Sequence, residues 1–170
     1  MDLLELFRWA DNNLPGTFYL REATYAFSIL LTVHVVAMCL FMGLIVMMDL
    51  RLSGLGFRGI PLSHLQRRLF PWQMIGFLAI VVTGVMLFYS KPLYYYGKGF
   101  FWTKLVLIGL AGVNAMVFHL TTYQSVAEWD ANPTPPFGAK LAGVLGLLLW
   151  GSVLVTGRLV AYEWWTTEYF

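Results

Sequence analysis

The sequence has 170 residues, of which 59% are hydrophobic and 12% are charged, and its mean hydropathy is +0.68. Soluble domains carry about 25% charged residues, so the composition predicts an integral membrane protein and excludes an ordinary soluble domain. The net charge of +2 is too small to indicate nucleic-acid binding. The single cysteine, Cys39, excludes an internal disulfide.

The first segment, residues 2–10, is apolar on one helical face and charged on the other. It is too short to span a bilayer, so we predict a helix that lies at the membrane interface. Asn12, Asn13, Pro15 and Gly16 are expected to end it. Because the segment lacks a basic start and a long apolar core, no signal peptide is expected.

Four longer apolar segments follow, at about residues 24–48, 72–89, 101–120 and 139–157. Each is close to the roughly 20 residues that cross about 30 Å of hydrocarbon as a helix, and a helix satisfies its own backbone groups there. We therefore predict an all-α fold, with residues 1–170 forming one membrane domain. That domain is an integral membrane four-helix bundle with a short N-terminal interfacial helix.

An even number of spans places both termini on the same side of the membrane. The opposite side holds the connection 49–71, in which four arginines are concentrated: Arg51, Arg58, Arg67 and Arg68. Cytoplasmic connections carry an excess of Lys and Arg. This density favours a cytoplasmic location for that side and a periplasmic location for the termini.

His34 in the first span and His119 in the third carry the strongest functional signal, because ionisable residues at membrane depth are rare and are usually functional. His34 lies 13 residues after Arg21, and His119 lies 15 residues after Lys104. At 1.5 Å per residue their depths below these anchors are about 20 and about 22 Å. Matched depths predict that the two imidazoles are the axial ligands of one b-type haem. The alternative is that each histidine hydrogen-bonds a backbone carbonyl or a neighbour such as Thr83 or Asn114.

Residues near these histidines suit a porphyrin. Gly112 and Ala115 lie about two turns and one turn before His119 and would leave room for the ring, although small residues also allow close helix packing. Three basic residues near the ends of spans are candidates to pair with the propionates. They are Arg21, Lys104 and Arg158, and the alternative is that they extend to the lipid headgroups.

A copper site is an alternative use of the same two helices. His34, Met38 and Met42 share one face at intervals of four residues, and Met116 lies three residues before His119. Thioether and imidazole ligands suit Cu(I). Methionine is also an ordinary packing residue, and the connections contain no methionine-rich or histidine-rich segment that would capture the ion.

His64 is the third histidine and lies between the first two spans, outside the predicted hydrocarbon region. It is a candidate ligand for a second haem or metal, or a group that takes up protons beside a quinone. Exposure at the surface explains it equally well.

Two stretches of sequence carry a resemblance to known families. They are LLTVHVVAMCLFMGLIVMMDLRL around His34 and FWTKLVLIGLAGVNAMVFH from Phe101 to His119. Both resemble small four-helix bacterial membrane proteins related to the HemJ-type protoporphyrinogen oxidases and to the CopD-type membrane domain. The resemblance implies a location in the bacterial inner membrane and a b-type haem at His34, with Lys104 near its reactive edge.

Four functions follow as expectations. The first is a membrane cytochrome b that transfers electrons between a quinone pool and a redox partner protein. The second is an oxidoreductase of the HemJ type, and the third is a copper-binding or copper-transport protein. The fourth is a helical scaffold without a cofactor. Besides the lipid bilayer, a second copy of the chain is an expected partner, because an aromatic rim and glycine-rich faces permit self-association.

Overall fold

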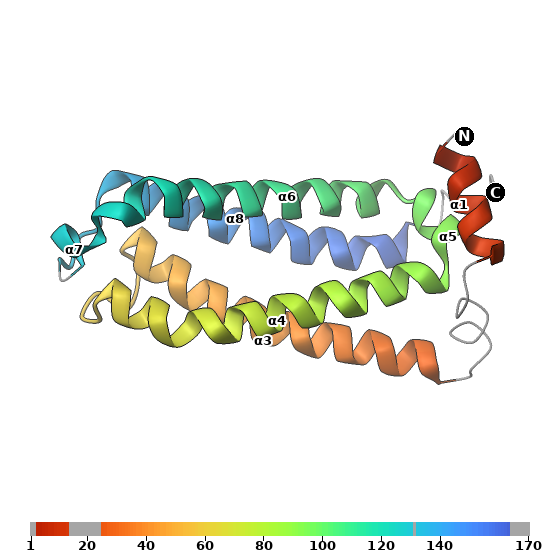
Figure 1. Ribbon diagram of the computed structural model, residues 1–170, viewed down its shortest axis with the longest axis horizontal. Coiled ribbons are helices and arrows are strands. Elements are labelled where there is room, and N and C mark those ends of the chain that lie inside the picture. Colours follow the sequence, from red (N-terminus) through yellow and green to blue (C-terminus); the bar gives the residue numbers. More distant parts are fainter. Residues whose placement is uncertain (1–2, 14–24, 131, 164–170) are drawn as a thin grey trace.

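A computed structural model describes residues 3–13, 25–130 and 132–163. Four long helices form its body (Figure 1): α3 (Ala26–Ser53), α4 (Leu62–Ser90), α6 (Gly99–Leu120) and α8 (Phe137–Leu159). Each of them is long and apolar enough to cross a membrane. The predicted all-α, four-span architecture is confirmed, and the chain is a multi-pass membrane protein.

The short elements lie at the two ends of the bundle. They are α1 (Leu3–Asn13), α5 (Pro92–Tyr96), the 3-10 helix η1 (Thr122–Ser125), α7 (Val126–Trp129) and the 3-10 helix η2 (Val160–Tyr162). Helix α1 runs three residues beyond its predicted end. Asn12 and Asn13 are its last two residues, and their side-chain amides donate hydrogen bonds to the carbonyls of Arg8 and Trp9 within the helix.

The connection between the first two spans is much shorter than residues 49–71. Helix α3 continues to Ser53 and stops at Gly54, which has a φ of +75°, a conformation that glycine adopts readily. Helix α4 begins at Leu62 and contains Pro71 in its interior. The hydropathy pattern identified only the apolar part of each helix. Both helices continue through polar residues beyond that part.

The four long helices pack as two pairs. Helix α3 packs along α4, α6 packs along α8, and the pairs join through α3 and α8, whereas α4 and α6 do not pack closely along each other (Figure 1). Gly143 allows the α3–α8 contact. A Cβ atom there would lie 2.6 Å from the carbonyl oxygen of Asp49 and 2.7 Å from the backbone nitrogen of Ser53. Small residues let membrane helices approach in this way.

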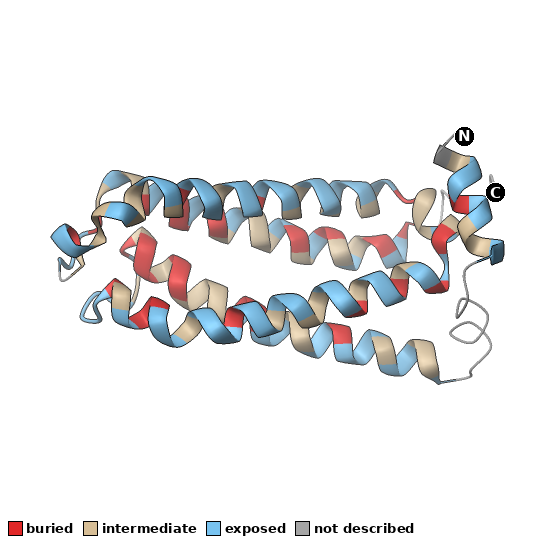
Figure 2. Ribbon diagram, viewed as in Figure 1, coloured by how far each residue is buried: buried red, intermediate tan, exposed pale blue. Residues whose placement is uncertain are grey.

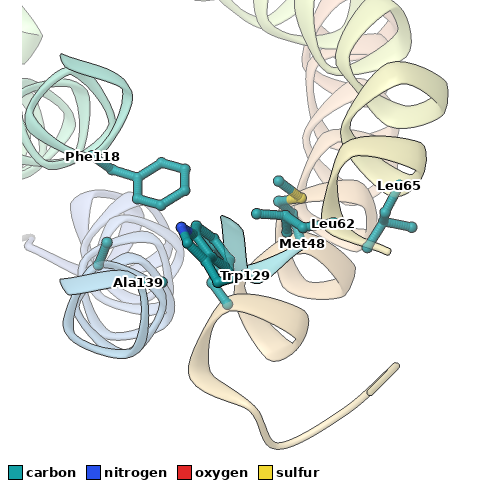
Figure 3. Packing of buried hydrophobic residues seen from close by; sticks show 8 residues of the cluster. Met48, Leu62, Leu65, Phe118, Trp129 and Ala139 are labelled. Carbon is teal, nitrogen blue, oxygen red and sulfur yellow. The ribbon is translucent and has the colours of Figure 1, made fainter. Parts of the chain in front are cut away.

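Buried residues are concentrated between the helices, and Figure 2 shows that much of the outer surface of the long helices is exposed. That surface is rich in large apolar side chains, as expected of helices that face lipid. A buried cluster closes the end where α3 meets α4 (Figure 3). It consists of Met48, Leu52, Leu62, Leu65, Phe118, Trp129, Ala139 and Ala142.

Arg51 joins the connections at this end. Its side chain is fully buried and donates hydrogen bonds to the carbonyls of Ile60 at 2.7 Å, Asp130 at 3.1 Å and Asn132 at 3.2 Å. The carboxylate of Asp130 in turn accepts hydrogen bonds from the backbone amide and hydroxyl of Ser63. Arg51 is therefore a structural tie between two connections rather than a loop residue.

The opposite end is closed by α1 and by the end of the described chain. Phe7 of α1 packs against Phe88, Tyr96 and Trp102, with ring centroids 4.9–6.1 Å apart. Glu163 accepts hydrogen bonds from the first two backbone amides of α6. A carboxylate at this position satisfies amides that the helix leaves free and interacts favourably with the helix dipole.

Candidate functional site: two cavities between α4 and α6

Two cavities lie within the bundle where α4 and α6 stay apart. Cavity 1, about 500 Å³, lies towards the end closed by α1 and is lined by His34, Met38 and Lys104 among mostly apolar side chains. Cavity 2, about 400 Å³, lies towards the opposite end and is lined by His119 and Asp49. Trp150 of α8 lines both cavities. The bundle therefore offers two binding spaces in sequence along its length.

His34 is 7% exposed and is held by Thr83 of α4, whose hydroxyl oxygen lies 2.7 Å from the imidazole Nδ1. The same hydroxyl donates its hydrogen to the carbonyl of Ala79, 2.6 Å away. It must then accept from His34, so Nδ1 carries the proton. Nε2 keeps a free lone pair and has no hydrogen-bond partner among the described residues. A ligating imidazole is commonly oriented by a partner on its other nitrogen.

Gly84 lets His34 lie directly against α4. A Cβ atom at Gly84 would be 3.3 Å from Cε1 of the imidazole, so any larger residue would press on the ring. Because Gly84 follows Thr83, one stretch of α4 supplies both the hydrogen bond and the space. The position and tautomer of His34 are therefore set by a neighbouring helix.

Lys104 of α6 is the cationic side chain among the described residues that line cavity 1. Its Nζ packs against α8, where a Cβ atom at Gly157 would be 3.3 Å from it. Of the two propionate candidates that the structure describes, Lys104 lines the same cavity as His34 and Arg158 does not. Arg158 instead stacks on and hydrogen-bonds Tyr162, and Arg21 lies outside the described residues.

The structure does not bring His34 and His119 together, because they line different cavities. His34 shares cavity 1 with Lys104, and His119 lies 15 residues farther along α6, which is about 22 Å at the helical rise. One haem gripped by both imidazoles does not fit this arrangement. The depth comparison took Arg21 and Lys104 as anchors at one level. Helix α3, however, begins only at Ala26, so His34 lies nearer to its end of the bundle than that comparison assumed.

His119 has partners for both ring nitrogens. Its Nδ1 lies 2.9 Å from the carbonyl of Ala115, to which it donates, and its Nε2 lies 3.4 Å from the amide nitrogen of Gln66. Ala115 lines cavity 2, but Gly112 is exposed and lines neither cavity. The porphyrin-facing surface expected along α6 is therefore not formed as one face beside His119.

The remaining candidate ligands divide between the cavities and the surface. Met38 and Met42 line cavity 1 together with His34, whereas Met116 lines cavity 2. His64 is exposed near the start of α4 and lines neither cavity. Within the described part of the chain, no group of three or more His, Cys, Asp or Glu side chains could hold a metal ion.

The sequence reasoning missed the polar lining of cavity 2. Asp49 and Gln66 were assigned to a long connection, but both lie inside helices, and Gln73 joins them from α4. The sequence does contain a sign that α3 extends past residue 48. Asp49 directly follows the apolar segment 24–48 without a glycine or proline between, which is compatible with a helix that continues.

Residues 6–163 match a family of unknown function, DUF6644. No curated protein and no solved structure matches the chain.

Proposed function

Because the chain belongs to the DUF6644 family, whose function is unknown, we propose a function from the chain's own residues: a haem b-binding membrane protein that transfers electrons, with His34 as the axial ligand. The observation that carries this proposal is the free Nε2 of His34 at an apolar cavity inside the bundle. An imidazole buried with a fixed tautomer and an unused lone pair suits an iron centre.

The cavity's size and lining support the proposal. Small-molecule and cofactor sites have volumes of about 300–1,000 Å³ and mostly apolar walls with few polar groups, and cavity 1, at about 500 Å³, fits this description. Lys104 would pair with a propionate, and the packed rings of Phe7 and Trp102 add apolar surface at the end closed by α1.

The residues of cavity 1 also define what the site can do. A haem supplies a one-electron couple, whose potential depends on the axial ligand and on burial. Thr83 holds His34 in the tautomer that ligates through Nε2, and the apolar wall keeps the site dry. Cavity 1 contains one imidazole, so the protein offers no second histidine there. Electron transfer to a quinone or to a redox partner protein is the activity we infer, with protoporphyrinogen oxidation as the enzymatic alternative.

The test is a reduced-minus-oxidised absorption spectrum of membranes that contain the chain. A sharp α band should be present in the wild type and absent in His34→Ala. The matched control is His119→Ala, which removes the other intramembrane histidine and should keep the band. A colourless wild-type protein overturns the proposal, and loss of the band in both variants overturns the assignment to cavity 1. Rescue of a strain that lacks protoporphyrinogen oxidase would identify the enzymatic alternative.

Copper binding is a second candidate, because Met38 and Met42 line the same cavity as His34. Two thioethers and one imidazole form a donor set that suits Cu(I). Replacing both methionines with leucine keeps an apolar side chain of similar volume. Under the copper hypothesis this double variant loses bound copper, measured by elemental analysis of the purified protein. Under the haem hypothesis it retains the α band.

We also propose that the chain lies in a bacterial inner membrane with both termini on the periplasmic side. The support is the clustering of exposed arginines at the opposite end, where Arg58, Arg67 and Arg68 lie within a short stretch of sequence. Arg51 is buried and does not contribute to this surface. Periplasmic and cytoplasmic reporter fusions at the C-terminus test the orientation, and activity of the cytoplasmic reporter would contradict it.

A further inference from the structure

Cavity 2 has a polar lining that the proposed haem site does not use. Five described polar side chains contribute to it: Asp49, Gln66, Gln73, Asn114 and His119. They come from three helices, α3, α4 and α6, each of which is long and apolar enough to cross a membrane. Polar and ionisable side chains that face the interior of a membrane bundle are expensive and usually functional. The hydrogen bonds that these groups already make show what kind of ligand they could accept.

Two amides of the lining are fixed through their nitrogens. Gln73 donates to the carbonyl of Leu44 at 3.2 Å, and Asn114 donates to the carbonyl of Ala142 at 2.9 Å. In each side chain the amide oxygen accepts no hydrogen bond from a described residue. Each of these side chains therefore joins two helices through one N–H, and its amide oxygen and second N–H have no partner among the described residues.

Gln66 is also paired through its amide nitrogen, in this case with His119. The imidazole donates through Nδ1 to the carbonyl of Ala115, and its Nε2 is an acceptor beside the Gln66 amide nitrogen at 3.4 Å. This pairing uses a donor of Gln66 and again leaves its amide oxygen without a partner among the described residues. His119 contributes no further N–H to cavity 2.

Asp49 is the strongest acceptor of this group. Its side chain is 8% exposed, its Oδ2 is buried without a partner, and neither carboxyl oxygen accepts a hydrogen bond from a described residue. Space for the carboxyl group exists only because Gly146 of α8 has no side chain, since a Cβ atom there would overlap it. A buried acceptor left unpaired is destabilising. The carboxyl group of Asp49 therefore needs a hydrogen-bond donor that the described residues do not supply to it.

A ligand can reach cavity 2 from the bilayer. Phe70 and Met74 of α4 and Met116 of α6 line the cavity and are 44%, 45% and 55% exposed. They lie on the two helices that do not pack along each other, so the cavity meets the lipid-facing surface there. A suitable ligand is apolar enough to dissolve in lipid and carries hydroxyl donors on a compact head group. We infer that cavity 2 binds the head group of a membrane hydroquinone, with a hydroxyl donating to Asp49.

Cavity 2 should bind the reduced form, the hydroquinone, more tightly than the oxidised form, the quinone. A hydroquinone carries two hydroxyl donors, whereas the corresponding quinone carries carbonyl acceptors only. Towards the carboxyl group of Asp49, the quinone loses the hydrogen bond that the hydroquinone makes. The quinone would leave the buried carboxyl oxygen of Asp49 unpaired, which is unfavourable. The site should therefore prefer the reduced form by about tenfold or more, and tenfold in affinity corresponds to about 1.4 kcal/mol.

The test uses duroquinol and duroquinone as short, soluble probes, titrated by calorimetry under nitrogen into the full chain in lipid nanodiscs. Wild type should bind duroquinol at least about tenfold more tightly than duroquinone. Asp49→Asn replaces one carboxyl oxygen with an amide donor of the same size and should abolish that preference. Thr156→Val is the matched control, because Thr156 is a buried polar residue that bonds only carbonyls of its own helix and does not line cavity 2.

Three outcomes overturn the inference. One is equal affinity of the wild type for the two probes, a comparison that does not depend on any variant folding. Another is an Asp49→Asn protein that keeps the preference of the wild type. Displacement of duroquinol by sodium ions at constant ionic strength would instead show that the oxygen-rich lining is a cation site, which also overturns it.

This inference goes beyond the haem proposal and does not depend on it. His34→Ala should lose the α band and keep duroquinol binding, because His34 lines the other cavity. Asp49→Asn should keep the α band and lose the preference for duroquinol. Either proposal can therefore fail while the other stands.

Discussion

The contact between α3 and α8 at Gly143 gives a stability prediction that needs no cofactor. A Cβ atom at Gly143 would lie 2.6–2.8 Å from atoms of Asp49, Leu52 and Ser53, two of them backbone atoms that cannot rotate away. Gly143→Ala therefore requires α3 and α8 to separate. Gly151 lies on the same helix and has nothing within 4 Å of its Cβ position. Gly151→Ala is thus a matched control for the change of residue type.

The expected loss of stability is the difference in the free energy of unfolding between Gly143→Ala and Gly151→Ala. Overpacking a tight contact costs about 1–3 kcal/mol, whereas the better helix propensity of alanine contributes about 0.5–1 kcal/mol at both sites and cancels. Gly143→Ala should therefore be less stable than Gly151→Ala by about 1–3 kcal/mol. Thermal unfolding in detergent, followed by circular dichroism, measures this as about 2–4 °C per kcal/mol. Equal stability of the two variants would refute the packing of α3 against α8 described above.

Three further predictions concern the ends of the bundle and cavity 1. Glu163→Ala removes the acceptor for the first two amides of α6 and should lower the free energy of unfolding by about 0.5–2 kcal/mol, measured by the same thermal assay. Arg51→Met leaves three carbonyls without their buried donor and should be destabilising by at least about 2 kcal/mol; a variant as stable as the wild type would contradict the role of Arg51 as a tie between connections. Thr83→Val removes the acceptor that fixes the tautomer of His34 and should weaken haem retention by about 10–100-fold. Haem titration of the purified apoprotein measures that effect, and Thr156→Val should leave retention unchanged.

The hydropathy of each segment predicted the four long helices, because hydropathy depends only on the residues of that segment. Each of the four predicted spans overlaps one of the four long helices, and the largest differences lie at the end of α3 and the start of α4. Asp49 and Gln66 were assigned to a connection because polar residues end an apolar run, but they do not end a helix. Gly54, with its positive φ, is what ends α3.

Contacts between residues on different helices were predicted less well. His34 and His119 were each identified as unusual from their apolar surroundings, and the structure places both inside the bundle. Their relative depth depended on an anchor, Arg21, whose level the sequence does not give. The bond from His34 to Thr83 joins residues 49 positions apart. Thr83 was considered only as one of the neighbours that a buried histidine could bond.

The sequence by itself determined that this chain crosses a membrane as four helices, because twenty consecutive apolar residues have no other stable arrangement in hydrocarbon. It also determined which side chains are costly to place there. Only the tertiary structure decided that the two histidines occupy separate cavities and that Asp49 lies beside Gly146 of another helix. Depth, rotation and partner helix are set by packing between segments, and no single segment carries that information.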